Sequence, residues 1–229
     1  MNDAVALKKE KTQAFLKTLS EERFERYTVL SNGDEAVALR LYEANAQLSQ
    51  ALYIPLQALE VTLRNRIHTE LSAKYDCFWF DIPDLLKAKA QIEGVGETKG
   101  RLVHDKKKIE AGRIIAGLSF GFWTGLFGNQ YEELWRSDLH KIVIEEERPS
   151  RRKQFAGPLR QIREIRNRVA HHECIINWRL NDHYGHMKTI LKRLSPEAHY
   201  WMLNNSTFED VYKEWKQLLK DVHEMKNKR

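Results

Sequence analysis

The stretch that decides the fold class is DEAVALRLYEANAQLSQALYIPLQALEVTLRNRIHTELSAKY, residues 34–75. From Val37 through Leu59 to Leu71, its apolar side chains recur every three or four residues, which is the spacing of one face of an α-helix. Pro55 interrupts the pattern with a residue that lacks a backbone N–H and crowds the preceding turn. The stretch therefore predicts one long central helix that is kinked near this proline.

The rest of the chain favours an all-α fold, because alternating runs of β-branched and aromatic residues are scarce. Glycines 94, 96 and 100 predict a loop, with a further helix after it over residues 101–116. We expect a single helical domain over residues 1–229. Its parts are N-terminal helices within 1–33, the long helix at 34–75, a helix at 159–173 and C-terminal helices within 181–226.

Composition excludes several protein classes. The chain has 229 residues, of which 42% are hydrophobic, and only 11 Gly and 5 Pro, so it is neither collagen-like nor disordered. No apolar run approaches the roughly 20 residues that cross a bilayer, and the charged start lacks the apolar centre of a signal peptide. Two cysteines outside any CxxC spacing indicate neither a disulfide framework nor structural zinc. We expect a cytoplasmic protein with no membrane partner.

Positive charge is concentrated in the second half of the chain. The formal net charge is +6, and the stretch RPSRRKQFAGPLRQIREIRNR, residues 148–168, holds eight basic residues and one acid. Such a stretch favours a polyanionic partner, and we expect RNA. The part at 148–153 is either a solvated loop or a phosphate contact. The candidate RNA-binding residues are Arg151, Arg152, Lys153, Arg160, Arg163 and Arg168.

The chemistry-bearing motif is REIRNRVAHHE, residues 163–173. On a helical wheel its apolar residues form one stripe, made of Leu159, Ile162, Ile165 and Val169. An adjoining sector about 140° wide carries Arg166, Arg163, Asn167 and His171. Asn167 and His171 stand four residues apart, so the amide is expected to orient the imidazole. The helix is thus expected to present a permanent cation beside a group that titrates near neutrality.

Those residue types suit RNA cleavage without a metal ion or other cofactor. Attack by a ribose 2′-OH needs a base near pH 7, for which His171 is the candidate, and a fixed cation for the phosphoryl charge, for which Arg166 is the candidate. One helix supplies a single such histidine. The acid for the leaving oxygen then comes either from the same helix of a second subunit or from Arg64 and His68 on the long helix.

Blander interpretations of the same residues stand beside this one. An Arg and a His on an amphipathic helix are most often solvated or form a core pair. His172 points to another side of the helix and is expected to be structural. The neighbouring Glu173 suggests a metal site, but adjacent residues point about 100° apart and no HExxH spacing is present, so no metal site is expected. The aromatic stretch FGFWTGLF, residues 120–127, is expected to be packing rather than a base-stacking surface.

Three separated segments carry a family resemblance: LQALEVTLRNRIH at 56–68, LSFGFWTGLF at 118–127 and EIRNRVAHHECI at 164–175. Together they resemble the Abi-like (abortive infection, AbiD/AbiF-type) proteins. Arg166 and His171, with the polar Asn167 after the arginine, resemble the Rx4-6H signature of the HEPN superfamily. The resemblance implies a HEPN-like helical bundle and a homodimer whose Arg-His helices meet. It also implies metal-independent endoribonuclease activity in phage defence or toxin–antitoxin settings, with a protein or small RNA as antitoxin.

Site residues follow from matching the motifs. Arg166 and His171 correspond to the catalytic pair and Asn167 to the positioning residue. A possible second set is Arg64, Asn65 and His68, although its spacing is R-x3-H rather than R-x4-H. Two alternatives to an enzyme stay open. One is a non-catalytic RNA-binding module that holds a small regulatory RNA, and the other is a helical adaptor that binds no RNA.

Overall fold

A computed structural model describes residues 14–144 and 151–227, and within these ranges it contains helices and no strand. The all-α prediction is confirmed. Most of the helix expected at 4–19, and residues 148–150 of the basic stretch, lie outside the described residues. The chain divides into two compact units, each described by itself below.

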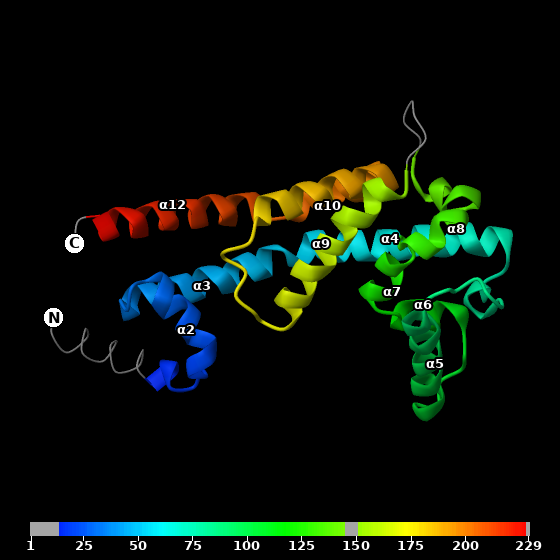
Figure 1. Ribbon diagram of the computed structural model, residues 1–229, viewed down its shortest axis with the longest axis horizontal. Coiled ribbons are helices and arrows are strands. Elements are labelled where there is room, and N and C mark those ends of the chain that lie inside the picture. Colours follow the sequence, from blue (N-terminus) through cyan, green and yellow to red (C-terminus); the bar gives the residue numbers. More distant parts are fainter. Residues whose placement is uncertain (1–13, 145–150, 228–229) are drawn as a thin grey trace. The chain divides into compact units, whose positions relative to one another are not determined.

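The first unit contains residues 1–51, 168–178 and 207–229. Its helices are α2 (Glu21–Leu30), α3 (Glu35–Ala51), the last turn of α9 and α12 (Phe208–Asn227). Ser20 caps α2 by accepting a hydrogen bond from the Arg23 amide. In Figure 1, α12 lies alongside α3, and Trp215 of α12 is buried. A core of Tyr27, Leu41 and Leu48 completes this packing.

The second unit contains residues 52–167 and 179–206. Its long helix is α4 (Tyr53–Lys74), and α10 (Leu180–Leu194) and α11 (Pro196–Asn205) both pack against it (Figure 1). The remaining elements are η1 (Trp79–Asp81), α5 (Lys89–His104), α6 (Ala111–Gly117), α7 (Phe120–Gly125), η2 (Asn129–Tyr131), α8 (Glu132–Ser137), η3 (Leu139–Ile142) and most of α9 (Lys153–Ala170). The aromatic residues Phe120, Phe122, Trp123 and Phe127 are all buried, so this stretch packs in the core.

The long helix is interrupted as expected, but the interruption is at Leu52, three residues before Pro55. Helix α3 ends at Ala51 and α4 begins at Tyr53, with Leu52 between them. Pro55 therefore stands in the first turn of α4. A proline is tolerated there because most first-turn N–H groups have no acceptor inside the helix.

The loop expected at residues 94–100 is wrong, because α5 runs through it from Lys89 to His104. Its buried face is formed by Gln91, Val95 and Thr98, at helical spacing. Gln91 also donates a 2.8 Å hydrogen bond to the Phe122 carbonyl. These contacts offset the conformational cost of glycine in a helix. The helix expected at 101–116 is correspondingly divided, since residues 105–110 lie between α5 and α6.

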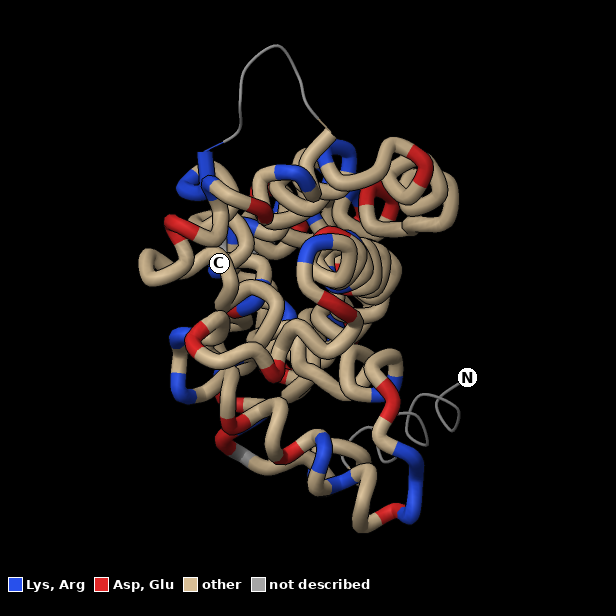
Figure 2. Tube along the Cα trace, turned by 90° about the vertical axis from the view of Figure 1, so that its right-hand side faces the viewer, with Lys and Arg blue, Asp and Glu red and all other residues tan. Residues whose placement is uncertain are grey.

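Charges of both signs occur along the whole described trace. Figure 2 shows Lys and Arg positions interspersed with Asp and Glu. A candidate anion-binding surface must therefore be identified from the exposure and pairing of individual side chains. None of the described helices has the length and apolar character needed to span a bilayer.

Candidate active site

Helix α9 (Lys153–Ala170) carries most of the motif, and its apolar face fixes its orientation in the second unit. Phe155, Leu159, Ile162 and Ile165 are fully buried along one stripe. The wheel predicts the last three of these, whereas Val169, the fourth residue that it predicts, is half-buried. Arg160 is exposed on the other side. The helix begins six residues before its expected start at 159 and includes Pro158 within its second turn. The residues expected to form a basic linker are thus partly helical.

The end of α9 differs from the prediction in a way that changes the site. The helix was expected to continue to Glu173, but it ends at Ala170. His172 adopts a left-handed conformation with φ of 54°, where its amide donates to the Val169 carbonyl at 3.1 Å. The Glu173 amide donates to the Arg168 carbonyl at 2.9 Å. This pair of bonds is a Schellman motif, which terminates a helix.

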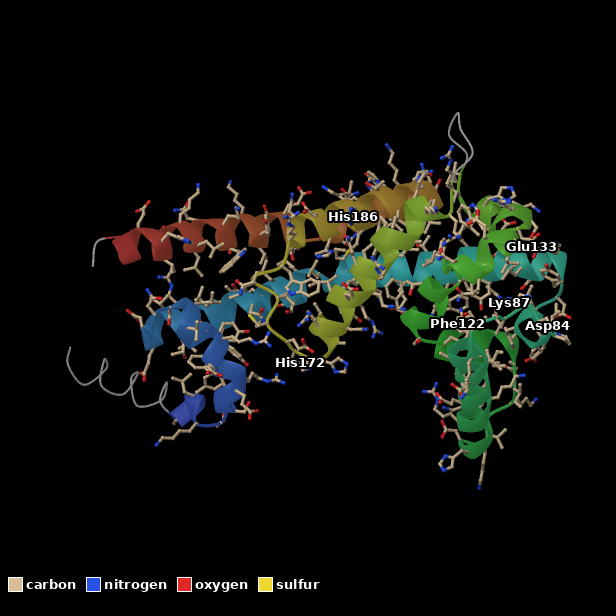
Figure 3. All side chains as sticks on the ribbon, viewed as in Figure 1. Asp84, Lys87, Phe122, Glu133, His172 and His186 are labelled. Carbon is tan, nitrogen blue, oxygen red and sulfur yellow. The ribbon has the colours of Figure 1, made fainter. Side chains whose placement is uncertain are left out.

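His171 therefore lies in the turn after the helix and not on a further helical turn. His171 directly follows the last helical residue, four positions after Asn167, so the expected contact between these two side chains stays a prediction. The His171 side chain is exposed, and it has no hydrogen-bond or ion-pair partner among the described residues. Figure 3 labels the adjacent His172 where α9 ends. An exposed imidazole in such a turn is accessible to a ligand.

Helix α3 holds this turn in the first unit through Asn45. This side chain is 6% exposed, donates from Nδ2 to the Glu173 carbonyl at 3.3 Å and accepts at Oδ1 from the Ile175 amide at 2.7 Å. Arg23 Nη1 adds a 3.4 Å hydrogen bond to the His172 carbonyl. Sequence analysis missed Asn45. The available signal was an amide on the apolar face of the long helical pattern.

In the second unit, Arg166 lies beside a carboxylate that sequence analysis also missed. Its Nε is 3.8 Å from Oε2 of Glu60 on α4. Arg64 follows Glu60 by one helical turn and also acts on its charge. Burial raises the pKa of Glu60 above 4.5, and the positive charges of Arg166 and Arg64 oppose that increase. The first arginines of both R-N motifs therefore flank one carboxylate.

The histidine of the second motif is bound within the protein. Trp79 Nε1 donates to His68 Nδ1 at 3.1 Å, and Ser72 Oγ lies 3.2 Å from the same nitrogen. An indole N–H can only donate, so Nδ1 is the acceptor and the neutral ring carries its proton on Nε2. Burial also lowers the pKa of His68. Asn65 of this motif is exposed.

The residues of the first motif are divided between the two units. Arg166 and Asn167 belong to the second unit, whereas His171 belongs to the first. Asn167 is exposed, and Arg166 retains 36% of its side-chain surface. Each group is therefore accessible within its own unit.

The expected RNA-binding residues differ in how far they are exposed. Arg151, Lys153 and Arg160 are exposed, and the half-buried Arg163 has its Cδ next to Gly121. Arg168 forms a 2.5 Å ion pair with Glu173 and lies over the Trp178 ring at 4.6 Å.

Arg152 was expected to contact RNA, but its side chain is 3% exposed. It donates to Glu132 Oε2 at 2.7 Å, to Asn129 Oδ1 at 2.8 Å and to the Phe127 carbonyl. These internal bonds use all three of its nitrogens. We therefore leave Arg152 out of the candidate RNA surface.

The described residues contain no group of three or more His, Cys, Asp or Glu side chains that could hold a metal ion. This statement covers residues 14–144 and 151–227.

Comparison with known proteins gives one match. A family model described as Abi-like protein matches residues 11–177. The matched range contains α9 together with the segments 56–68, 118–127 and 164–175. No curated protein and no solved structure matches the chain.

Proposed function

Because this chain belongs to the Abi-like protein family, we propose that it acts in abortive infection or phage defence as an endoribonuclease that uses no metal ion. The observation that carries the proposal is the pair Arg166 and His171. Arg166 is partly exposed on α9, and His171 is exposed in the turn after that helix. A permanent cation and an imidazole are two of the groups that metal-free transfer of an RNA phosphoryl group uses.

In the proposed reaction, the 2′-oxygen attacks the adjacent phosphorus and the bond from phosphorus to the 5′-oxygen breaks. His171 accepts the proton of the 2′-OH, and Arg166 balances charge on the phosphoryl oxygens. The 5′-oxygen leaves with a proton from a second acid. The products are a 2′,3′-cyclic phosphate and a 5′-hydroxyl.

The reaction needs a second acid, and a homodimer would supply it, because each protomer contributes one His171. His68 is the less suitable source, because its Nδ1 already accepts from Trp79. Light scattering of the purified chain measures the mass, and cleavage by mixed dimers of His171→Ala and Arg166→Ala protomers tests whether the two groups work across protomers.

The function is tested by cleavage of cellular RNA by the purified chain in EDTA. Wild-type protein is expected to produce fragments with 2′,3′-cyclic phosphate ends, whereas Arg166→Ala and His171→Ala are not. His172→Asn is the matched control, because it changes the neighbouring histidine to a residue that tolerates the left-handed conformation. Equal cleavage by the wild type and by the first two variants would refute the assignment.

The rival function is an RNA-binding module that holds a small regulatory RNA without cutting it. Three exposed cations support it, namely Arg151 just before α9 and Lys153 and Arg160 on that helix, because phosphate binding needs no histidine. This function predicts salt-dependent RNA binding in wild type and His171→Ala alike, with no cleavage products from either protein.

A further inference from the structure

Glu60 lies near the positive charges of two arginines of the second unit. It lies on α4, where Arg64 follows it by four residues, the spacing that places two side chains on one helix face. Arg166 reaches it from α9, with Nε 3.8 Å from Oε2. Only 23% of the Glu60 side-chain surface is exposed. The carboxylate is thus partly screened from water by the groups that it attracts.

The contact engages only one edge of the Arg166 guanidinium. The group is planar and carries five N–H donors, and it approaches Glu60 through Nε at an ion-pair distance, longer than a hydrogen bond. Among the described residues, Arg166 has no other hydrogen-bond or ion-pair partner. The terminal nitrogens remain for a phosphate, which guanidinium binds through two parallel N–H groups.

Both helices hold their part of the cluster rigidly. Leu59 and Leu63, on either side of Glu60 in the sequence, are fully buried in α4, and Ile162 and Ile165 are fully buried in α9. Close packing of these neighbours limits how far either backbone can move. Groups on such elements are held more accurately than groups on loops.

Arg64 adds a second, independent observation. Its Nε is buried and has no hydrogen-bond partner among the described residues. Its one described attraction is to the charge of Glu60.

We propose that Glu60 is the positioning residue of the RNA-cleaving site, holding Arg166 by its Nε edge so that its terminal nitrogens meet the scissile phosphate. Arg64, one helical turn after Glu60, is a second cation near the same carboxylate, and it contributes to the Arg166 site rather than to a separate site with His68. This inference rests on the proposed function of Arg166. Glu60 itself touches no reacting atom.

The test compares Glu60→Gln and Glu60→Asp with Glu70→Gln as the matched control. Glu70 lies on the same helix, and it forms no ion pair with any of the described residues. Glu60→Gln is expected to lower kcat by roughly tenfold to a hundredfold, as misplaced catalytic groups do. KM should change less than kcat, because the exposed cations of α9 still bind the RNA. Glu60→Asp should restore part of the rate, and Glu70→Gln should match wild type.

A second readout does not depend on cleavage. The Nε–H signal of Arg166, assigned by its loss in Arg166→Lys, reports on the ion pair in the nitrogen-15 spectrum of the full chain. Its exchange with solvent is expected to accelerate severalfold in Glu60→Gln and to stay unchanged in Glu70→Gln.

The two readouts separate the possible failures. An unchanged Arg166 signal in Glu60→Gln overturns the positioning role, whether or not the protein cuts RNA. A higher kcat with tighter RNA binding in Glu60→Gln also overturns it, because Glu60 would then compete with phosphate. If wild type cuts no RNA while the Arg166 signal responds, the proposed function fails and the contact between Glu60 and Arg166 is upheld.

Discussion

Two segments of this chain have nearly the same sequence but end in different environments. They are Leu63–His68 in α4 and Ile165–His171 at the end of α9. Both contain Arg-Asn-Arg followed by an apolar residue. The first arginines, Arg64 and Arg166, both act on Glu60. The first arginine of each segment therefore lies near the same carboxylate.

The second arginine of each segment is engaged by its own surroundings. Arg66 donates to the carbonyls of Ile142 and Lys141 at 3.1 and 3.2 Å. Arg168 pairs with Glu173 at 2.5 Å. These arginines stabilise the local structure, and neither side chain is fully exposed.

The histidines separate the two segments. Helix α4 continues to Lys74, so His68 stays on the helix, where its ring accepts from Trp79. Helix α9 ends at Ala170, and His171 in the following turn is exposed. The comparison teaches that the neighbours of each histidine, rather than residue identity, decide which imidazole is available to a ligand.

The largest expected effect tests that difference directly. His171→Ala should reduce RNA cleavage by about 10²- to 10⁴-fold, the usual contribution of a general base. His68→Ala should reduce it by less than tenfold, because this ring is committed to Trp79. Single-turnover cleavage rates, with circular dichroism to confirm folding, make the measurement. Equal losses in the two variants would mean that both histidines do chemistry.

The order of the two variants should be reversed when stability is measured, with the larger loss in His68→Ala. Trp79 is fully buried, so His68→Ala leaves its indole N–H without an acceptor, at a cost of about 1–3 kcal/mol in the free energy of unfolding. His171→Ala should stay within about 0.5 kcal/mol of wild type, as exposed substitutions do. Urea unfolding at pH 7.5 gives both values. A large loss in His171→Ala would show that its turn is part of the core.

The pH dependence of stability should also distinguish His68 from the exposed His171, with a smaller effect than the substitutions above. Burial lowers the pKa of His68 below 6.5, so below that pH the unfolded chain binds more protons than the folded chain. The contribution of neutral His68 to the free energy of unfolding is therefore fully present above pH 6.5, and it is lost as the pH falls through the lowered pKa. In urea unfolding, wild type should lose stability relative to His68→Gln when the pH is lowered from 7.5 to 5. A constant difference between the two proteins would contradict the role of burial.

The smallest effect concerns the surface cations. Lys153→Ala and Arg160→Ala should each reduce the slope of log binding constant against log salt by about 0.7, the value for one phosphate of single-stranded RNA. Arg66→Ala should leave the slope unchanged but destabilise the fold by about 1–2 kcal/mol, because it removes hydrogen bonds to two carbonyls. Fluorescence anisotropy with a labelled RNA at several salt concentrations measures the slopes. A reduced slope in Arg66→Ala would place phosphate contacts on α4 as well.

The sequence predicted long amphipathic elements better than their ends. The apolar spacing of α4 and α9 was recognised because it is set by burial of one face. The end of α9 was missed because His172, rather than the usual glycine or asparagine, takes the left-handed position. The helical course of residues 94–100 was missed because buried Gln91 and Thr98 outweigh the glycines through tertiary contacts.

By itself, the sequence determined that this chain is helical, that it belongs with the Abi-like proteins and that Arg166, Asn167 and His171 are the residues to test. Periodicity and motif spacing are local properties, and they can be read along the chain. Only the tertiary structure decided that Glu60 meets Arg166, that Arg152 is internal, and that one histidine is bound while the other is exposed. Those outcomes depend on contacts between residues far apart in sequence, whose free energies outweigh local preference.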